Sequence, residues 1–420
     1  MKSDQYRHLW FLCAGSCAAL FLATAAIAQN EEPPPGNALP DEPNQEEVGI
    51  LQKGFGRGGL TQWQTEGELG EMPAPEHVVR AVTDTVRAME QTVRAGDAET
   101  YLTYVWSGDP GFRREQEQWA KDINHRAPKA FKVTIDSEHV TIEDAIASTE
   151  ITWNWTTDGL PQSLTFPGSF FRITTDSGEQ WLYAGEKFRA RGGYRENIYA
   201  LEENSGFQRT VGRAMRDVRR HVERGMGTRI DKMVPIRIYP NEKHFAFSNG
   251  LLKHETQPWQ IDPAQPVKLI ANDEIEEDAL KADLARRFTM LTLHEIGSHA
   301  DQMPWWIATG IAEFACEKFE DDLEPNMEKV RGPLKAGDLP KFASLSNVSS
   351  LSDTDRMLAI EMGHNLLGYI ADSYSREQRQ DWVKMLANGS SLEAATRETF
   401  EISADELEAK WAAWLSESGE

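Results

Sequence analysis

The residues best suited to chemistry lie at positions 293–299, where the chain reads LHEIGSH. Two histidines four residues apart on a helix can hold zinc, and a glutamate that follows the first can act as a general base. Here the second histidine, His299, comes five residues after His294, so Ser298 stands at the ligand position. Five residues of a regular helix rotate a side chain by about 140°. The spacing therefore predicts that His294 and Glu295 are retained but that the second metal ligand is lost.

A long helix must position this segment. It is expected to begin near Asp273, with Glu276 placed for a capping box, and its apolar stripe reaches His294. The stripe consists of Leu280, Leu284, Phe288 and Leu291. Two runs before it, at residues 234–239 and 265–270, predict strands. An earlier stripe predicts an amphipathic helix that ends at Gly225 and Gly227, and its members are Phe207, Val211, Met215, Val218 and Val222.

More helices are expected after the motif. One opens with Pro304, Trp305 and Trp306. The last helices are marked by a stop at Asn388 and Gly389, and by two predicted capping boxes, which are Ser390 with Glu393 and Ser403 with Glu406.

This order of elements resembles the peptidase MA-like (gluzincin) domains of secreted bacterial proteins across residues 207–415. The closing segments DWVKMLANGSSLEAA and ISADELEAKWAAWL look like the last helices of that family. The resemblance implies a mainly helical domain with a small sheet and a zinc-dependent peptidase site. Its third metal ligand would be the glutamate of a W-x-x-E-G segment. Here that segment runs from Trp306 to Gly310, and Thr309 occupies the glutamate position.

Two irregular geometries would restore a metal site. A one-residue π-bulge near Ser298 would bring His299 back beside His294, with Glu313 as the carboxylate ligand. Alternatively, Glu295 and His299 would form the helical pair, completed by Glu313 or Asp301. Without such a geometry we expect no bound zinc.

Three functions follow from these alternatives. The preferred one is binding of a peptide or an envelope protein in the groove where a protease would hold its substrate. The second is a zinc-dependent peptidase in which Glu295 is the general base and His294, His299 and Glu313 hold the metal. The third places a small ligand in the N-terminal half of the chain.

That N-terminal half, residues 76–190, begins with helical apolar spacing and changes after Trp119 to the alternation of strands. With the step RAGDAETY after its first helix, it resembles the nuclear transport factor two-like (cystatin-like) domains across residues 76–188. The resemblance implies a cone of helices on a curved antiparallel sheet. The whole chain is thus predicted to be α+β, with a hinge at residues 189–193 and a second domain at residues 195–420.

The N-terminus predicts export. Residues 1–28 have a basic start, an apolar run and a small-residue cleavage site before Gln29, as in a secretory signal peptide. Residues 29–75 are rich in Pro, Glu and Gly and predict a disordered tether. After cleavage only Cys316 remains, so no internal disulfide can form, and a small buried role is expected for it. A net charge of -23 argues against nucleic acid or an anionic membrane surface as partner.

If this interpretation is right, the mature protein is secreted or periplasmic and begins near Gln29. N-terminal sequencing of the exported form should start there. A retained Met1 or a lipid-modified Cys17 would contradict it.

Overall fold

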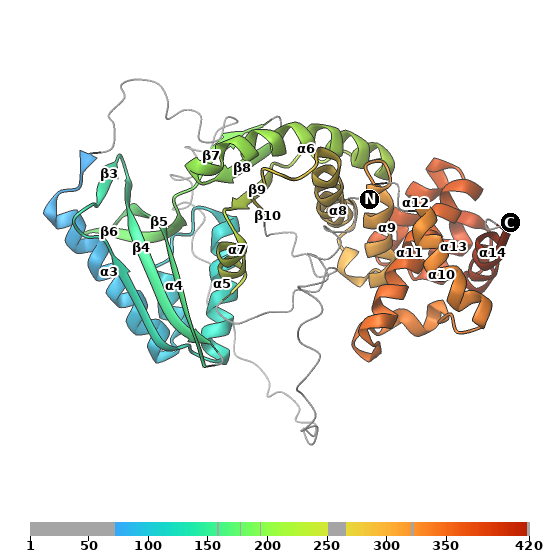
Figure 1. Ribbon diagram of the computed structural model, residues 1–420, viewed down its shortest axis with the longest axis horizontal. Coiled ribbons are helices and arrows are strands. Elements are labelled where there is room, and N and C mark those ends of the chain that lie inside the picture. Colours follow the sequence, from blue (N-terminus) through green and yellow to red (C-terminus); the bar gives the residue numbers. More distant parts are fainter. Residues whose placement is uncertain are drawn as a thin grey trace, which may run out of the picture. The chain divides into compact units, whose positions relative to one another are not determined.

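The computed structural model describes residues 72–420 except residues 158, 177, 194, 251–265, 321–322 and 418–420 (Figure 1). It is α+β, with an antiparallel sheet, a second small sheet and a helical C-terminal region. The predicted α+β class is confirmed, whereas the cone and the gluzincin-like domain stay predictions. The predicted signal peptide and residues 29–71 of the predicted tether lie outside the described residues. Among the described helices, none has both the length and the apolar character that crossing a bilayer requires.

Three helices open the described chain, and they are α3 (Glu76–Ala95), α4 (Ala98–Thr103) and α5 (Pro110–His125). α3 buries one stripe, as its apolar spacing predicts, formed by Val78, Val82, Val86, Met89 and Val93. α4 and α5 each begin after an aspartate whose carboxylate accepts a hydrogen bond from a backbone N–H of the first turn.

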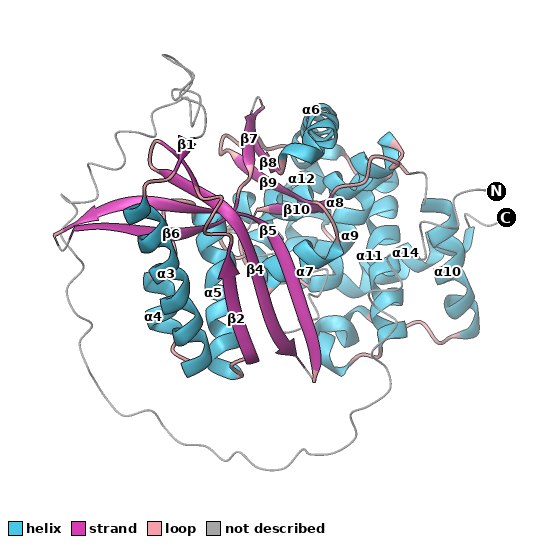
Figure 2. Cartoon of the chain, turned by 60° about the vertical axis from the view of Figure 1, so that its left-hand side comes forward, coloured by secondary structure: helices cyan, strands magenta, loops and turns pink. Residues whose placement is uncertain are grey.

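The first sheet contains β1 (Met72–Pro73), β2 (Lys129–Ile135), β3 (Thr141–Glu143), β4 (Ile146–Thr157), β5 (Leu160–Thr175) and β6 (Gly178–Glu186) (Figure 2). β4 lies at its centre: β5 pairs with one side of it, and β2 and β3 pair with the other. The predicted strands of this region are confirmed. One expectation is wrong, because residues 72–73, placed in the disordered tether, form β1 and pair with β3.

The interior of this sheet is filled by aromatic rings. Trp153 contacts Trp119 and Phe131, with ring centroids 5.4 and 5.6 Å apart. Phe247 joins them from α7 (Glu242–Asn249), a helix that the sequence did not predict. The indole N–H of Trp119 donates to the backbone carbonyl of Phe247 at 2.8 Å. A segment from the predicted second domain therefore completes the core of the first.

The second sheet has the order β10 (Val267–Ile270), β9 (Val234–Tyr239), β8 (Glu196–Ala200) and β7 (Arg189–Gly192). Its first three strands are parallel, and β7 runs antiparallel to β8. The predicted strand 234–239 is confirmed, whereas the expected hinge at residues 189–193 is largely a strand. The domain boundary drawn there stays a prediction.

Two long helices pack beside this sheet, α6 (Ser205–Met226) and α8 (Glu277–Ile296). Both were predicted from their apolar stripes, and they lie side by side. The expected capping box of α8 is wrong, because Glu276 is itself the N-cap residue and makes no side-chain cap bond.

The C-terminal helices are α9 (Trp305–Cys316), α10 (Leu323–Ala336), α11 (Asp353–Ser373), α12 (Arg376–Ala387), α13 (Leu392–Phe400) and α14 (Ala404–Glu417). Short 3₁₀ turns occur at Glu202–Asn204, Ala300–Gln302, Phe342–Ser346 and Val348–Ser350. α9 and α11 touch through glycines, since a Cβ on Gly310 would lie 2.3 Å from the carbonyl carbon of Gly363.

Of the two capping boxes predicted for the last helices, the structure contains one. The predicted box of Ser403 and Glu406 is confirmed by both of its hydrogen bonds. The box of Ser390 and Glu393 is wrong, because Ser391 caps α13.

Charged side chains are buried where α5 meets the second sheet. Glu115 accepts a hydrogen bond from the hydroxyl of Tyr239 at 2.9 Å and lies 3.3 Å from the ammonium of Lys268. Its other oxygen is 3.4 Å from Arg237, which also pairs with Asp109 at 2.6 Å. Burial lowers the pKa of the Lys268 ammonium and the Glu115 carboxylate opposes that change. One carboxylate thus compensates two cations of the second sheet.

Replacing Glu115 with Gln should therefore destabilise the protein by about 3 kcal/mol, because Arg237 and Lys268 would stay buried without enough negative charge. Glu117→Gln, two residues along α5 and paired with Arg113 and Arg114 at the surface, is the matched control and should cost less than about 1 kcal/mol. Urea unfolding measures both. Equal effects would contradict the role given to Glu115.

Candidate functional site

The helix that carries the LHEIGSH segment ends earlier than either predicted geometry requires. α8 ends at Ile296, and Gly297 is extended, with φ -146° and ψ 139°. A Cβ at Gly297 would lie 2.1 Å from the carbonyl oxygen of Ala387 at the end of α12. The N–H of His299 donates to that same oxygen at 3.0 Å. The regular helix through Ser298 and the π-bulge are therefore both wrong.

The predicted ligands consequently lie apart. His294 is half-buried in the last turn of α8, whereas His299 is exposed after the helix has ended. The ring of His299 lies beside Gly389, and its Nδ1 is 3.0 Å from the hydroxyl of Ser298. Asp301 is exposed in the following 3₁₀ turn.

The predicted general base and the predicted carboxylate ligand each face a cation. Glu295 is 2.7 Å from the ammonium of Lys232, in a surface pair. Glu313 on α9 accepts two hydrogen bonds from Arg286 of α8, at 2.7 and 2.9 Å. Thr309, at the family's glutamate position, is buried and donates to the backbone carbonyl of Trp305 at 2.9 Å.

This arrangement does not fit zinc. Within the described part of the chain, no three His, Cys, Asp or Glu side chains converge in a way that could hold a metal ion. A zinc site needs three converging protein ligands and one open position. The helix end separates His299 from His294, and Arg286 holds the carboxylate of Glu313.

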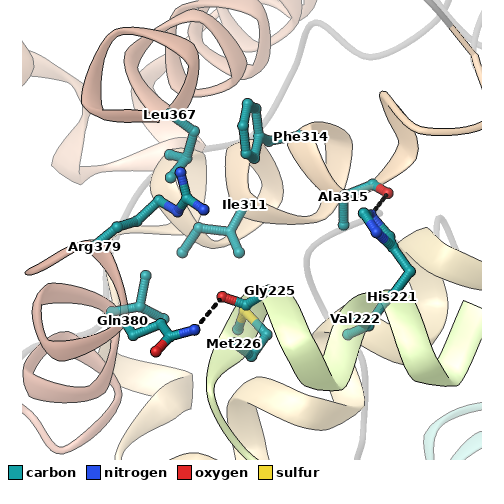
Figure 3. A pocket seen from close by; sticks show the side chains of 11 residues that line it. His221, Val222, Gly225, Met226, Ile311, Phe314, Ala315, Leu367, Arg379 and Gln380 are labelled. Atoms are coloured by element: carbon teal, nitrogen blue, oxygen red, sulfur yellow. Dashed lines mark hydrogen bonds between the residues drawn. The ribbon is translucent and has the colours of Figure 1, made fainter. Parts of the chain in front are cut away.

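A small pocket of about 100 Å³ opens between α6, α9, α11 and α12 (Figure 3). Its floor is apolar and includes Met226, Ile311, Phe314, Leu367 and Val383. Arg379 reaches across it from α12, with its guanidinium carbon 5.5 Å from the ring centroid of Phe314. Burial lowers the pKa of Arg379.

Polar groups line the rim of this pocket. His221 contacts the backbone carbonyl of Ala315 through Nε2 at 3.0 Å, and burial lowers the pKa of its imidazole. The amide of Gln380 donates to the backbone carbonyls of Arg224 and Gly225. Those contacts fix the side chains of His221 and Gln380, so the pocket combines an apolar interior with the guanidinium of Arg379, which lies over the ring of Phe314.

A polar chain that the sequence did not predict lies between α9, α10 and α11. Lys329 donates to Oδ1 of Asn326 at 2.7 Å, which turns the Asn326 amide nitrogen toward Nδ1 of His364 at 2.9 Å. Nδ1 of His364 therefore accepts and its proton lies on Nε2, which is 2.5 Å from Glu317. Burial raises the pKa of nearby Glu361, which pairs with Lys329 at 2.7 Å. Since His364 is only 2% exposed, this row of polar side chains connects the three helices and is not accessible to a substrate.

Cys316 is buried, as expected for a small apolar residue. Its thiol points to the backbone carbonyls of Ala282 and Ala312, each 3.2 Å away. Burial raises the pKa of the thiol, which disfavours the reactive thiolate form.

Comparison with protein-family models and with curated proteins finds no match for this chain.

The two carboxylates of the predicted site should respond differently to substitution. Glu313→Gln removes the carboxylate that accepts two hydrogen bonds from Arg286, whose side chain is 23% exposed, and should lower the free energy of unfolding by about 2 kcal/mol. Glu295→Gln removes a surface pair and should change it by less than about 1 kcal/mol. Urea unfolding compares the two variants. A large loss for Glu295→Gln with none for Glu313→Gln would contradict these assignments.

Proposed function

We propose that this exported protein is a binding protein built on a gluzincin-like scaffold that no longer hydrolyses peptides. In this proposal the N-terminal half is a nuclear transport factor two-like cone, and the C-terminal half holds a peptide or an exposed segment of an envelope protein. The order of elements supports the scaffold: a small sheet, the long α8, and then α9 opening with Trp305 and Trp306.

The observation that carries the loss of hydrolysis is the ion pair between Glu295 and Lys232, at 2.7 Å. A general base must accept a proton from a metal-bound water, and it must face that water to do so. Here the carboxylate faces an ammonium. With His299 beyond the end of α8, the groups that would hold and activate the water are not assembled.

The pocket between α6, α9, α11 and α12 supports binding. Pockets for free small molecules usually measure about 300–1,000 Å³, so one of about 100 Å³ suits a single inserted side chain. Its apolar floor suits an aliphatic or aromatic residue, and Arg379 suits a carbonyl or carboxylate next to that residue. The N-terminal cone offers less room, because its interior is filled by Trp119, Trp153 and Phe247.

The test is a selection of short random peptides displayed on phage against the mature protein, followed by binding measurements on the enriched peptides. We expect them to share one large apolar residue. Arg379→Ala should weaken binding by about tenfold, because it removes the cation that positions that residue's backbone. Arg376→Ala, on the exposed first turn of α12, is the control and should change binding less than about twofold.

Mass spectrometry of the same peptides after incubation with the protein and added zinc should recover them intact. Cleavage that Glu295→Gln abolishes would contradict the proposal and establish a peptidase. A selection that enriches no peptide would contradict the binding role.

A further inference from the structure

The outward face of α6 carries an unusual line of charge. Five of its arginines recur at intervals of four, three, four and four residues, which places them within about 80° of arc on one face of the helix. All five are exposed. They form what we call the arginine stripe, consisting of Arg209, Arg213, Arg216, Arg220 and Arg224. In Figure 1, α6 runs along the top of the picture, with no described helix or strand drawn above it.

The stripe is poorly neutralised by the described residues. Arg220 pairs with Asp217 at 3.5 Å, and both side chains are solvent-accessible. Lys281 of α8 lies 4.0 Å from the same aspartate and also pairs with Glu277 at 2.7 Å and with Asp278 at 3.6 Å, so these carboxylates are shared with a sixth cation. The pKa of the Glu277 carboxyl is lowered, chiefly by its hydrogen bond with Lys281 and to a smaller extent by Arg213. Positive charge therefore exceeds negative charge along this face, in a protein whose net charge is -23.

The sixth arginine of α6, Arg219, has a structural role and provides a comparison for the exposed stripe. Arg219 is buried and is held by Glu196 at 2.9 Å, by Glu223 at 3.2 Å and by the carbonyl of Ile230. The fold satisfies this arginine completely. The centre of the stripe lies about 100° around the helix from Arg219, and its exposed side chains contribute nothing comparable to the core.

We propose that the arginine stripe binds an extended acidic peptide segment of a partner protein. This inference goes beyond the pocket described above, because the stripe and the residues of α6 that line the pocket lie on different faces of the helix. Guanidinium groups pair with carboxylates through two parallel hydrogen bonds, which makes arginine suited to such a ligand.

The spacing of the stripe matches an extended chain. Neighbouring arginines four residues apart are separated by about 6 Å along the helix axis. Alternate residues of an extended peptide are separated by about 6.7 Å and point to the same side. A peptide of about seven residues with a carboxylate at every second position would therefore span the stripe, which is about 22 Å long.

Two other polyanions fit less well. A membrane-binding helix presents apolar residues to the lipid, but the apolar residues of α6 are buried in the protein core, including Phe207, Val211 and Val218. Proteins that bind single-stranded nucleic acid interleave aromatic side chains with cations. The aromatic residue of α6, Phe207, is buried.

The experiment uses the full mature chain and a fluorescent peptide of about eight residues in which glutamate and serine alternate. The variant replaces Arg213, Arg216 and Arg220 with Gln. The control replaces Arg80, Arg87 and Arg397, which are exposed on α3 and α13, with Gln and changes the net charge equally. Fluorescence anisotropy gives the affinities, and thermal melting checks that both variants are folded.

We expect the wild type to bind the peptide, the stripe variant to bind it at least about tenfold more weakly, and the control to lose less than about twofold. Affinity should fall as salt rises from about 50 to 300 mM. No binding by the wild type, or an equal loss in both variants, would overturn the proposal. Tighter binding of an oligothymidylate of equal length, or of vesicles containing phosphatidylglycerol, would also overturn it by assigning the stripe to another class of partner.

Discussion

One close contact, between the backbone of Gly297 and the carbonyl oxygen of Ala387, sets the path of the chain through the LHEIGSH segment. There is no space for a side chain at Gly297, because a Cβ would lie 2.1 Å from that oxygen. The same oxygen accepts the N–H of His299. The end of α12 thus stops α8 and directs the chain away from it. The LHEIGSH segment is split between a helix and a turn, and His299 leaves the face that carries His294.

How much of this is encoded locally can be judged from particular elements. The apolar stripes of α3, α6 and α8 and the alternation in β4 and β5 were predictable, because each follows from the spacing of apolar residues within a short segment. The end of α8 was not, because it depends on Ala387, which is distant along the chain. The partners of Glu295 and Glu313 could not be predicted either, because Lys232 is 63 residues from Glu295 and Arg286 is 27 residues from Glu313. The spacing of residues shows which of them share a helix face, but it does not show which cation from a distant segment will pair with a carboxylate on that face.

The contacts between the first sheet and the second could not be predicted from local sequence patterns either. α7 is short and only weakly amphipathic, so its sequence gave no sign that Phe247 enters the aromatic core around Trp153. Glu115 likewise looks like an ordinary helical surface residue until Arg237 and Lys268 are placed beside it. Buried charges of this kind cost much when one partner is removed, so they tie the two sheets into one structure.

The central claim is that the helix end prevents a zinc site. It is tested most directly by elemental analysis of the mature wild type after gel filtration, together with the His294→Ala and His299→Ala variants. The account predicts less than about one zinc in ten molecules in all three proteins, because two imidazoles and a carboxylate are not brought together. Near-stoichiometric zinc in the wild type that is lost in both variants would contradict it.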